Sequence, residues 1–233
     1  MSQKVRPMTK FKRGVKFFIL FFFSTSIFSV LVLGFVPITF TPLMLIRSVE
    51  QAFDGEFPVA KRNWNSYNNI SPNMVLAVVS SEDNKFPEHY GFDFVAIERA
   101  LKHNSKKSKK IRGGSTISQQ TAKNVFLVPA RTWVRKGLET YFTVLIELTW
   151  SKRRIMEAYL NIVELGNGVY GVQSASEFYF EKDADKLTKS QAALLAATLP
   201  SPLKRDPGDP NGKLRRKQAL ILRIMRKVKE VNL

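Results

Sequence analysis

Two adjacent acidic residues, Glu82 and Asp83, are the first candidates for chemistry in this sequence. They follow the apolar run 74–79 and precede a Phe-Pro pair, His89 and Gly91. An apolar helix that ends in a carboxylate can hold it at the rim of a cleft. Partial burial there raises the carboxyl pKa and makes a general base or acid. The simpler interpretation is that both acids are solvated and close a helix.

A glycine-rich turn, Gly-Gly-Ser-Thr at 113–116, is the second candidate. It opens a predicted helix whose first amides and hydroxyls can bind an anion. It also fits a capping box between Thr116 and Gln119, and both interpretations can hold together. The basic stretch 102–112 leads into this turn and lacks periodicity, so we expect a mobile loop there.

A third candidate lies on a long predicted helix, 132–150. Arg135 and Glu139 are four residues apart on one face of this helix, and Arg131 lies a turn earlier. The ordinary interpretation is a surface ion pair, which contributes only about tenths of a kcal/mol.

Helical caps and apolar periodicity predict the elements that must position these residues. The predicted helices cover 72–82, 94–103, 116–126, 132–150, 151–166, 172–180, 188–199 and 214–231. No strand-like alternation of any length appears. The part of the chain beyond residue 36 is therefore predicted to be all-α.

The uncharged run 17–36 has the length of a bilayer-spanning helix, about 20 residues. Six basic residues and no acid precede it, which places the N-terminus in the cytoplasm: Lys4, Arg6, Lys10, Lys12, Arg13 and Lys16. A cleaved signal peptide is disfavoured, since its apolar core is usually only about 7–15 residues and no A-x-A-like site follows. We therefore predict a cytoplasmic tail at 1–16, an uncleaved anchor at 17–36, a membrane-proximal connector at 37–69 and a final domain at 70–233.

Composition excludes some classes of protein and favours others. The chain has 233 residues, a net charge of +18, no cysteine and two histidines. Disulfides, thiolate metal sites and His-rich zinc sites are thereby excluded or improbable. The basic excess favours an anionic partner, which could be nucleic acid, an anionic membrane surface or a phosphorylated substrate.

Four stretches stand together in a fixed order along the chain. They are Glu82-Asp83-x-x-Phe86-x-x-His89-x-Gly91, Gly113-Gly114-Ser115-Thr116-Ile117-Ser118-Gln119-Gln120, Arg135-Lys136-x-x-Glu139 and Lys152-x-x-Ile155-x-x-x-Tyr159-Leu160-Asn161. With a fifth stretch at 187–202, they resemble the peptidoglycan glycosyltransferases of glycosyltransferase family 51. Because the chain stops soon afterwards, it resembles the monofunctional biosynthetic type.

This resemblance implies a mostly helical, lysozyme-like glycosyltransferase domain at 70–233 on one membrane anchor. Such an enzyme polymerises lipid II with inversion, through attack of an acceptor 4-hydroxyl and departure of undecaprenyl pyrophosphate. It further implies a single-pass protein of the bacterial inner membrane with its catalytic domain outside the cytoplasm. Its partners would be lipid II, the growing glycan, the bilayer and other cell-wall synthesis proteins, and not nucleic acid.

The resemblance also assigns roles to individual residues. Glu82 is implied to be the catalytic base, and Glu139 the second carboxylate, near the leaving group or a divalent cation such as Mg²⁺ or Mn²⁺. Donor-site or substrate-binding positions are implied for Ser115, Thr116, Gln119, Gln120, Lys123, Arg131, Arg135 and Lys136. Motif positions with a structural role are implied for Asp83, Phe86, His89, Gly91, Gly113, Gly114, Tyr159 and Asn161.

Two other functions compete with this interpretation. A glycan-cleaving lytic enzyme of the same fold needs no cationic clamp for a diphosphate, so the cluster of Lys and Arg counts against it. A membrane-anchored binding protein could use the basic loop to hold anionic lipid or nucleic acid. An extracytoplasmic domain makes nucleic acid an improbable partner, and the loop lacks interleaved aromatic residues for base stacking.

Overall fold

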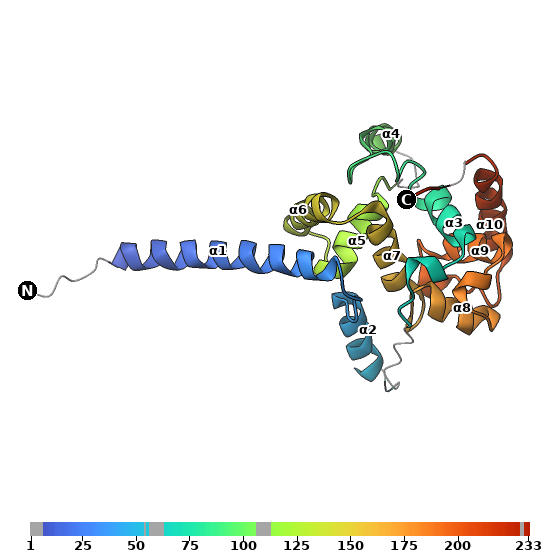
Figure 1. Ribbon diagram of the computed structural model, residues 1–233, viewed down its shortest axis with the longest axis horizontal. Helices are drawn as coiled ribbons and strands as arrows, with labels where there is room; N and C mark the ends of the chain where they lie inside the picture. The colour runs from blue at the N-terminus through green and yellow to red at the C-terminus, as the bar shows by residue number, and fades with distance from the viewer. Residues whose placement is uncertain (1–6, 54, 56–62, 106–112, 229–230) are drawn as a thin grey trace, which may run out of the picture. The chain divides into compact units, whose positions relative to one another are not determined.

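The computed structural model describes residues 7–53, 55, 63–105, 113–228 and 231–233. By its internal contacts the chain divides into two units, residues 1–36 and 37–233, and each is described by itself (Figure 1).

The first unit contains one long helix, α1 (Pro7–Leu33). It covers the predicted apolar run up to Leu33, begins ten residues before it, and leaves 34–36 in a turn. Within the stretch 10–33, an 18-residue window has a mean hydropathy of 2.2, so this helix is long enough and apolar enough to cross a membrane. Hydroxyl groups within it bond to the helix backbone, as Thr25 Oγ1 does to Phe21 O at 2.8 Å, so they cost little in an apolar setting.

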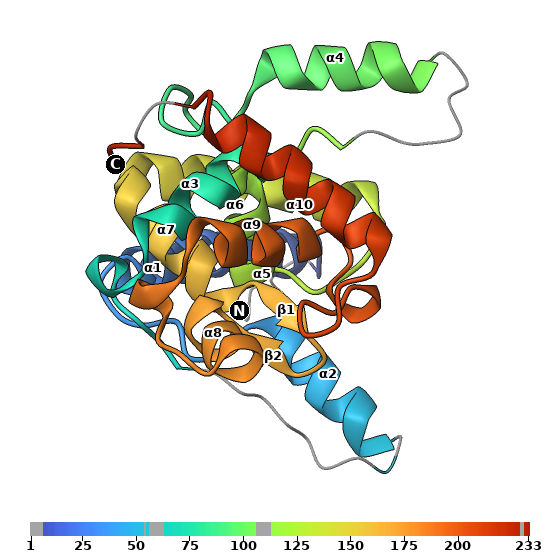
Figure 2. The same ribbon diagram turned by 90° about the vertical axis from the view of Figure 1, so that its right-hand side faces the viewer.

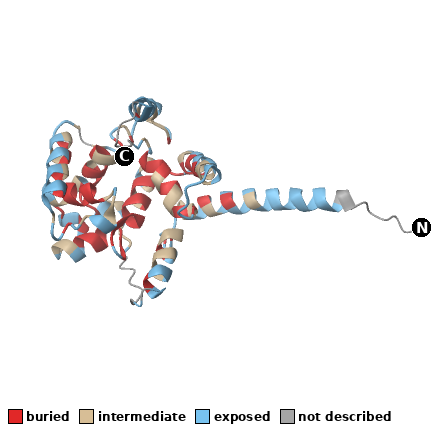
Figure 3. Ribbon diagram, turned by 180° about the vertical axis from the view of Figure 1, so that it is seen from behind, coloured by how far each residue is buried: buried red, intermediate tan, exposed pale blue. Residues whose placement is uncertain are grey.

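The centre of the second unit is formed by α3 (Pro72–Glu82) and α9 (Lys189–Thr198), which pack on each other and on α10 (Gly212–Met225) (Figure 2). The side chains at 192–198 in α9 and most of those in α3 are buried, so beyond the first turn of α9 neither helix has an exposed polar face. Such helices must be covered on all sides. Figure 3 shows the buried positions gathered in these central helices.

A second group of helices packs beside this centre. α5 (Ile117–Phe126) contacts both α6 (Trp133–Thr149) and α7 (Lys152–Ile162). Each helix starts where the sequence predicted, and Thr116, Thr132 and Ser151 each accept a hydrogen bond from a backbone amide in the first turn. Helix starts in this region were therefore predictable from single residues.

A small hairpin departs from the all-α prediction. β1 (Glu164–Gly166) pairs antiparallel with β2 (Val169–Tyr170) and leads into α8 (Val172–Phe180). Asn167 and Gly168 form its two-residue loop, and Gly168 has a φ of 67°. An Asn-Gly loop favours this geometry, but strands so short show no alternation in sequence. The chain is still mostly helical, as predicted.

Four other predictions need correction. The connector contains a full helix, α2 (Pro42–Phe53), and α7 ends at Ile162, short of the predicted 166. α4 (Phe94–Ser105) continues through 102–105, which we predicted as loop; the remainder, 106–112, lies outside the described residues. α10 ends at Met225, and not at 231. Short 3₁₀ turns occur at Tyr67–Asn69 (η1), Ala184–Lys186 (η2) and Pro202–Lys204 (η3).

Candidate active site

Glu82 is the last residue of α3, and its half-buried carboxylate is held from two other helices. Its Oε2 accepts a 3.0 Å hydrogen bond from Nε2 of Gln120 on α5. The Oε1 of Gln120 in turn accepts a 3.3 Å bond from the hydroxyl of Tyr159, which is fully buried in α7. The side chain of Glu82 therefore has a defined orientation before any substrate binds.

Asp83 is buried and ties the end of α3 to the start of α5. Both of its carboxylate oxygens lie 3.0 Å from Nε2 of His89, and Oδ2 accepts a 3.0 Å bond from the amide of Ile117. A helix N-terminus favours a negative charge at this place. Asp83 thus positions its neighbour Glu82, while its own carboxylate is occupied.

The residues that follow Asp83 pack under this junction. Phe86 is fully buried, and Nζ of Lys152 lies 4.6 Å from its ring centroid. Gly91 has a φ of +82°, and a Cβ there would lie 2.8 Å from Cγ2 of Thr143. The carbonyl of Gly91 accepts a 2.7 Å bond from Oγ1 of Thr116. A larger residue at 91 would therefore disturb the start of α5.

A cavity of about 430 Å³, the Glu82 cavity, lies at this junction. Its walls are the end of α3, one side of α4 and the turn at 113–116, so Glu82 and Ser115 line the same space. Thr116 also lines it, although its hydroxyl is already engaged in the helix cap. Gln119 completes that capping box, because its Oε1 accepts a 3.0 Å hydrogen bond from the amide of Thr116. Gln119 is not among the described residues that line the cavity. The turn therefore serves as both cap and cavity wall.

Asn161, the last predicted motif residue, lies away from this cavity. Its side chain accepts from the amide of Asn65 at 2.7 Å and donates to the carbonyl of the same residue at 2.8 Å. Asn161 thus fixes the segment before α3 onto α7, a structural role.

A second cavity of about 450 Å³, the cationic cavity, is lined by Lys123, Arg131 and Arg135. Glu139 is almost fully buried beside it, with Oε2 2.8 Å from Nη1 of Arg135 and Oε1 bonded to Nζ of Lys136. This is not the exposed surface pair that spacing alone suggested. Nε of Arg135 is buried without a hydrogen-bond partner among the described residues, so its guanidinium retains donors for a ligand.

Lys123 connects the two cavities electrostatically. Its pKa is lowered, chiefly because burial penalises the charged ammonium and also because Arg135 and Lys136 are close. Glu139 and Glu82 both oppose this by raising the pKa. Lys123 therefore feels both carboxylates, and it follows Gln120 by three residues on one face of α5.

The donor set does not fit a divalent cation held by the protein. Both oxygens of Glu139 are paired with cations, and the described ranges contain no group of three or more His, Cys, Asp or Glu placed to hold a metal ion. The predicted Mg²⁺ or Mn²⁺ is thus not supported by the residues around Glu139.

Sequence reasoning missed several residues in and near these cavities. Arg99 and Asp93 line the Glu82 cavity, and Arg47 and Glu164 line the cationic cavity. None of them belongs to the stretches on which the resemblance rests, so periodicity and spacing gave no signal.

A buried cluster under the junction was also missed. Glu147 accepts hydrogen bonds from the hydroxyl of Ser118 and from Nζ of Lys152, the latter at 2.8 Å. The cluster links α5, α6 and α7 and therefore helps to hold these three helices together.

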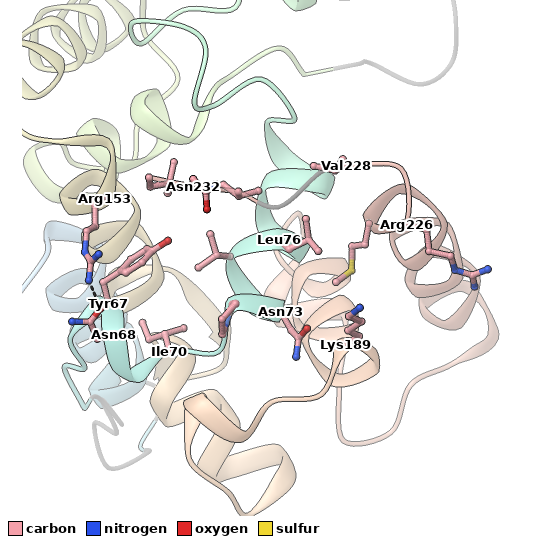
Figure 4. A pocket seen from close by; sticks show the side chains of 15 residues that line it. Tyr67, Asn68, Ile70, Asn73, Leu76, Arg153, Lys189, Arg226, Val228 and Asn232 are labelled. Atoms are coloured by element: carbon pink, nitrogen blue, oxygen red, sulfur yellow. Dashed lines mark hydrogen bonds between the residues drawn. The ribbon is translucent and has the colours of Figure 1, made fainter.

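The largest of the cavities described here, about 830 Å³, lies elsewhere, against α3, α10 and η1. Figure 4 shows Arg153 and Tyr67 on one wall and Arg226 on another. No residue to which the sequence assigned a role in catalysis or substrate binding lines it, so its size does not make it the active site.

A base at a cavity rim next to a cluster of cations around a buried carboxylate is the arrangement of an enzyme that transfers a group from an anionic leaving group. Comparison with known proteins identifies that class. Residues 50–226 match the family model described as Transglycosylase.

Curated relatives named biosynthetic peptidoglycan transglycosylase match over most of the chain. The protein from Bacteroides thetaiotaomicron is 52% identical over 219 residues, which is 94% of this chain and 88% of the relative. Those from Haemophilus influenzae and Escherichia coli K12 are 51% and 54% identical, over 89% and 81% of this chain and 85% and 78% of the relatives. The chain belongs to the transglycosylase family and is a peptidoglycan glycosyltransferase.

Proposed function

We propose that this chain polymerises peptidoglycan glycan strands from lipid II by inverting glycosyl transfer. The observation that carries the proposal is the arrangement on α5, where Gln120 holds Glu82 and Lys123 lies one turn further on, beside the cationic cavity. One helix face thus places a base next to a site for a diphosphate. The identity of the relatives, all named for peptidoglycan synthesis, supports the choice of substrate.

In the proposed reaction Glu82 accepts the proton of the acceptor sugar's 4-hydroxyl. The hydroxyl oxygen forms a bond to the donor's anomeric carbon from the face opposite the leaving group, and the bond to the diphosphate oxygen breaks. Undecaprenyl pyrophosphate leaves with the electron pair, and the configuration at the anomeric carbon inverts. A single base suffices because a diphosphate needs no strong protonation to depart.

The cations act on the leaving group. Lys123, Arg131 and Arg135 surround the space where negative charge would increase as the bond breaks, and fixed cations lower the energy of such a transition state. Glu139 holds Arg135 and Lys136 in place through a buried pair of contacts. A glycan-cleaving enzyme would have no use for this cluster, which favours the synthetic reaction.

The proposed setting is the bacterial inner membrane, with α1 as a single anchor. The six cations before residue 17 favour a cytoplasmic N-terminus, and residues 37–233 would then lie outside the cytoplasm, where lipid II is consumed. Reporter fusions after Gly212 should give an extracytoplasmic signal. A cytoplasmic signal would contradict the proposed substrate.

The reaction itself is tested by incubating the purified full chain in detergent with fluorescently labelled lipid II. We expect glycan polymer on a gel, and its digestion by a muramidase identifies the β-1,4 linkage. Release of shorter sugars from preformed glycan, with no polymer from lipid II, would instead establish the lytic alternative.

A further inference from the structure

A fourth cation, Arg47, lines the cationic cavity but comes from a part of the chain that carries none of the family stretches. It lies on α2, the helix of the connector before the catalytic domain. The wall that it shares with Lys123, Arg131 and Arg135 also contains Glu164 of β1.

The placement of Arg47 is fixed by contacts on both sides of it. Thr41 Oγ1 accepts a 3.3 Å hydrogen bond from the amide of Met44 and so caps α2. Met44 itself is buried. One turn after Arg47, Nε2 of Gln51 donates to Oδ1 of Asn167 in the hairpin loop at 3.1 Å. α2 also packs against α5, the helix that carries Lys123. Arg47 is therefore held in position before a ligand arrives, as a binding residue should be.

The guanidinium of Arg47 is only partly used by the protein. Nη1 donates to Oε2 of Glu50 at 2.6 Å on the exposed side of α2. Nε lies 3.4 Å from Oε1 of Glu164, and both atoms are buried without a hydrogen-bond partner among the described residues. An arginine has five N–H donors, so the hydrogen bonds to the described residues leave most of them available.

We propose that Arg47 is a further phosphate-binding residue for the diphosphate of the donor, in addition to Lys123, Arg131 and Arg135. Before the donor substrate binds, the 3.4 Å contact with Glu164 keeps the guanidinium of Arg47 at the cavity wall. The oxygens of a diphosphate in the cavity can accept hydrogen bonds from the unused N–H groups of Arg47 in a forked geometry. This inference rests on the proposed function, because it takes the ligand of the cationic cavity to be the donor's diphosphate.

The competing explanation is structural: Arg47 only neutralises Glu164. Burial raises the pKa of Glu164 and Arg47 opposes that effect, so the pair has an evident stabilising role. Removing Arg47 alone would leave a buried carboxylate unpaired and lower stability under either explanation. A single variant therefore cannot separate them.

A double-variant experiment does separate them. The variants are Arg47→Gln, Glu164→Gln and the two combined, with Glu50→Gln as control for the exposed partner of Arg47. Each full-length protein is melted in detergent, and its kcat and KM for lipid II are measured. We expect Arg47→Gln to lower both the melting temperature and kcat/KM, the latter by about tenfold for loss of one charge-assisted contact.

The result with the double variant decides. If Arg47 binds the diphosphate, adding Glu164→Gln restores the melting temperature but leaves kcat/KM about tenfold below that of Glu164→Gln alone. If the double variant instead recovers kcat/KM together with stability, Arg47 acts only through Glu164 and the proposal is wrong. Glu50→Gln should change kcat/KM by no more than about twofold and the melting temperature by no more than a few degrees.

A binding measurement keeps this test independent of the proposed reaction. Undecaprenyl pyrophosphate in detergent micelles should bind the wild type more tightly than the Arg47→Gln variant by a similar factor, whereas undecaprenol should bind both equally. Failure of the wild type to polymerise lipid II would refute the proposed function. Polymerisation with equal diphosphate affinity in both proteins would refute only the role of Arg47.

Discussion

Nε2 of Gln120 donates a hydrogen bond to Oε2 of Glu82 at 3.0 Å, so the proposed base is oriented by a side chain from a different helix. This leaves one carboxylate oxygen, Oε1, for the incoming hydroxyl. The same side chain carries the hydrogen bond from Tyr159, so base, amide and phenol form one chain from the cavity rim into the core.

Replacement of Glu82 by Gln should abolish most activity without unfolding the protein. The amide has the same shape and can still bond to Gln120, but it cannot accept the acceptor's proton. Loss of a general base lowers rates by at least about 10²-fold. Polymerisation of lipid II is measured beside Glu88→Gln, an exposed carboxylate six residues on, which should retain activity. Near wild-type turnover in Glu82→Gln would remove Glu82 from the mechanism.

The Tyr159→Phe variant isolates the orientation of the base. The change removes one hydroxyl from a fully buried ring, so the cost in stability should be only about 1 kcal/mol. Gln120 then loses its second partner and becomes free to rotate away from Glu82. We expect kcat to fall by roughly three- to tenfold with KM unchanged, since no substrate contact is lost. A rise in KM alone would mean that Tyr159 shapes a binding surface instead.

Helix starts and motif residues were predictable because each depends on a few neighbouring side chains. Thr116 with Gln119 forms the capping box that its spacing predicted, and Thr188 with Gln191 forms a second one at the start of α9. The resemblance brought Glu82 and Gln120 into one site, and the structure joins them by a hydrogen bond. Local chemistry and short motifs were therefore enough to predict most helix starts and to bring the motif residues together.

The cavity walls were not predictable, because they come from segments that are distant in sequence. Arg47 and Glu164 are separated by more than a hundred residues and share no motif, yet they line one cavity. The burial of Glu139 was not predicted for the same reason. Spacing alone suggested an exposed ion pair, but α6 packs on α5 and Glu139 is buried. Two strands of three and two residues were too short to leave a pattern.

Glu139→Gln should damage both stability and turnover. The change leaves Arg135 and Lys136 without their shared, buried counter-charge, which should cost about 1–3 kcal/mol. The two cations then lose their position around the leaving group, so kcat should fall at least about tenfold. Glu98→Gln is the matched control, because it removes an i,i+4 pair with Lys102 that is exposed on both sides. Equal melting temperatures for the two variants would mean that the Glu139 pair contributes no more than a surface one.

The basic loop and the cationic cavity should respond differently to salt. Lys106, Lys107, Lys109 and Lys110 lie outside the described residues, and we expect them to act at a distance on anionic substrate or membrane. Such effects are screened beyond about 8 Å at physiological ionic strength. Changing all four to Ser should therefore raise KM modestly at low salt, with the defect shrinking as salt is added.

Arg131→Gln provides the comparison for that loop variant. Its side chain lines the cavity, and a direct charge-assisted bond contributes about 1.5–3 kcal/mol, or roughly ten- to a hundredfold in rate. The loss should appear in kcat at saturating lipid II and persist across the salt series. If salt removed both defects equally, the arginine would steer substrate and not bind its diphosphate.

Lys123→Met should make the protein more stable and less active. The folded state lowers the pKa of Lys123 from its ordinary value of 10.5, mainly through burial, so the charged ammonium is a net cost to folding. The cost is fully present below the folded pKa. Between the folded pKa and 10.5 the unfolded state binds more protons, so stability rises with pH there. The melting temperature of Lys123→Met should therefore exceed that of the wild type at pH 7, and the gain should shrink towards pH 10.5.

The same lysine should set the alkaline limit of activity. Only the ammonium form can pair with the diphosphate, so turnover should fall as Lys123 loses its proton, at a pH below the ordinary lysine range. Lys123→Arg keeps the charge at all accessible pH values, so this variant should lose some activity at pH 7 but move the alkaline limb upwards. Rates of lipid II polymerisation between pH 6 and pH 10 would show it, with Lys227→Met, at an exposed position, as control. An unchanged alkaline limb in Lys123→Arg would assign that limb to another group and leave Lys123 without a role in the pH profile.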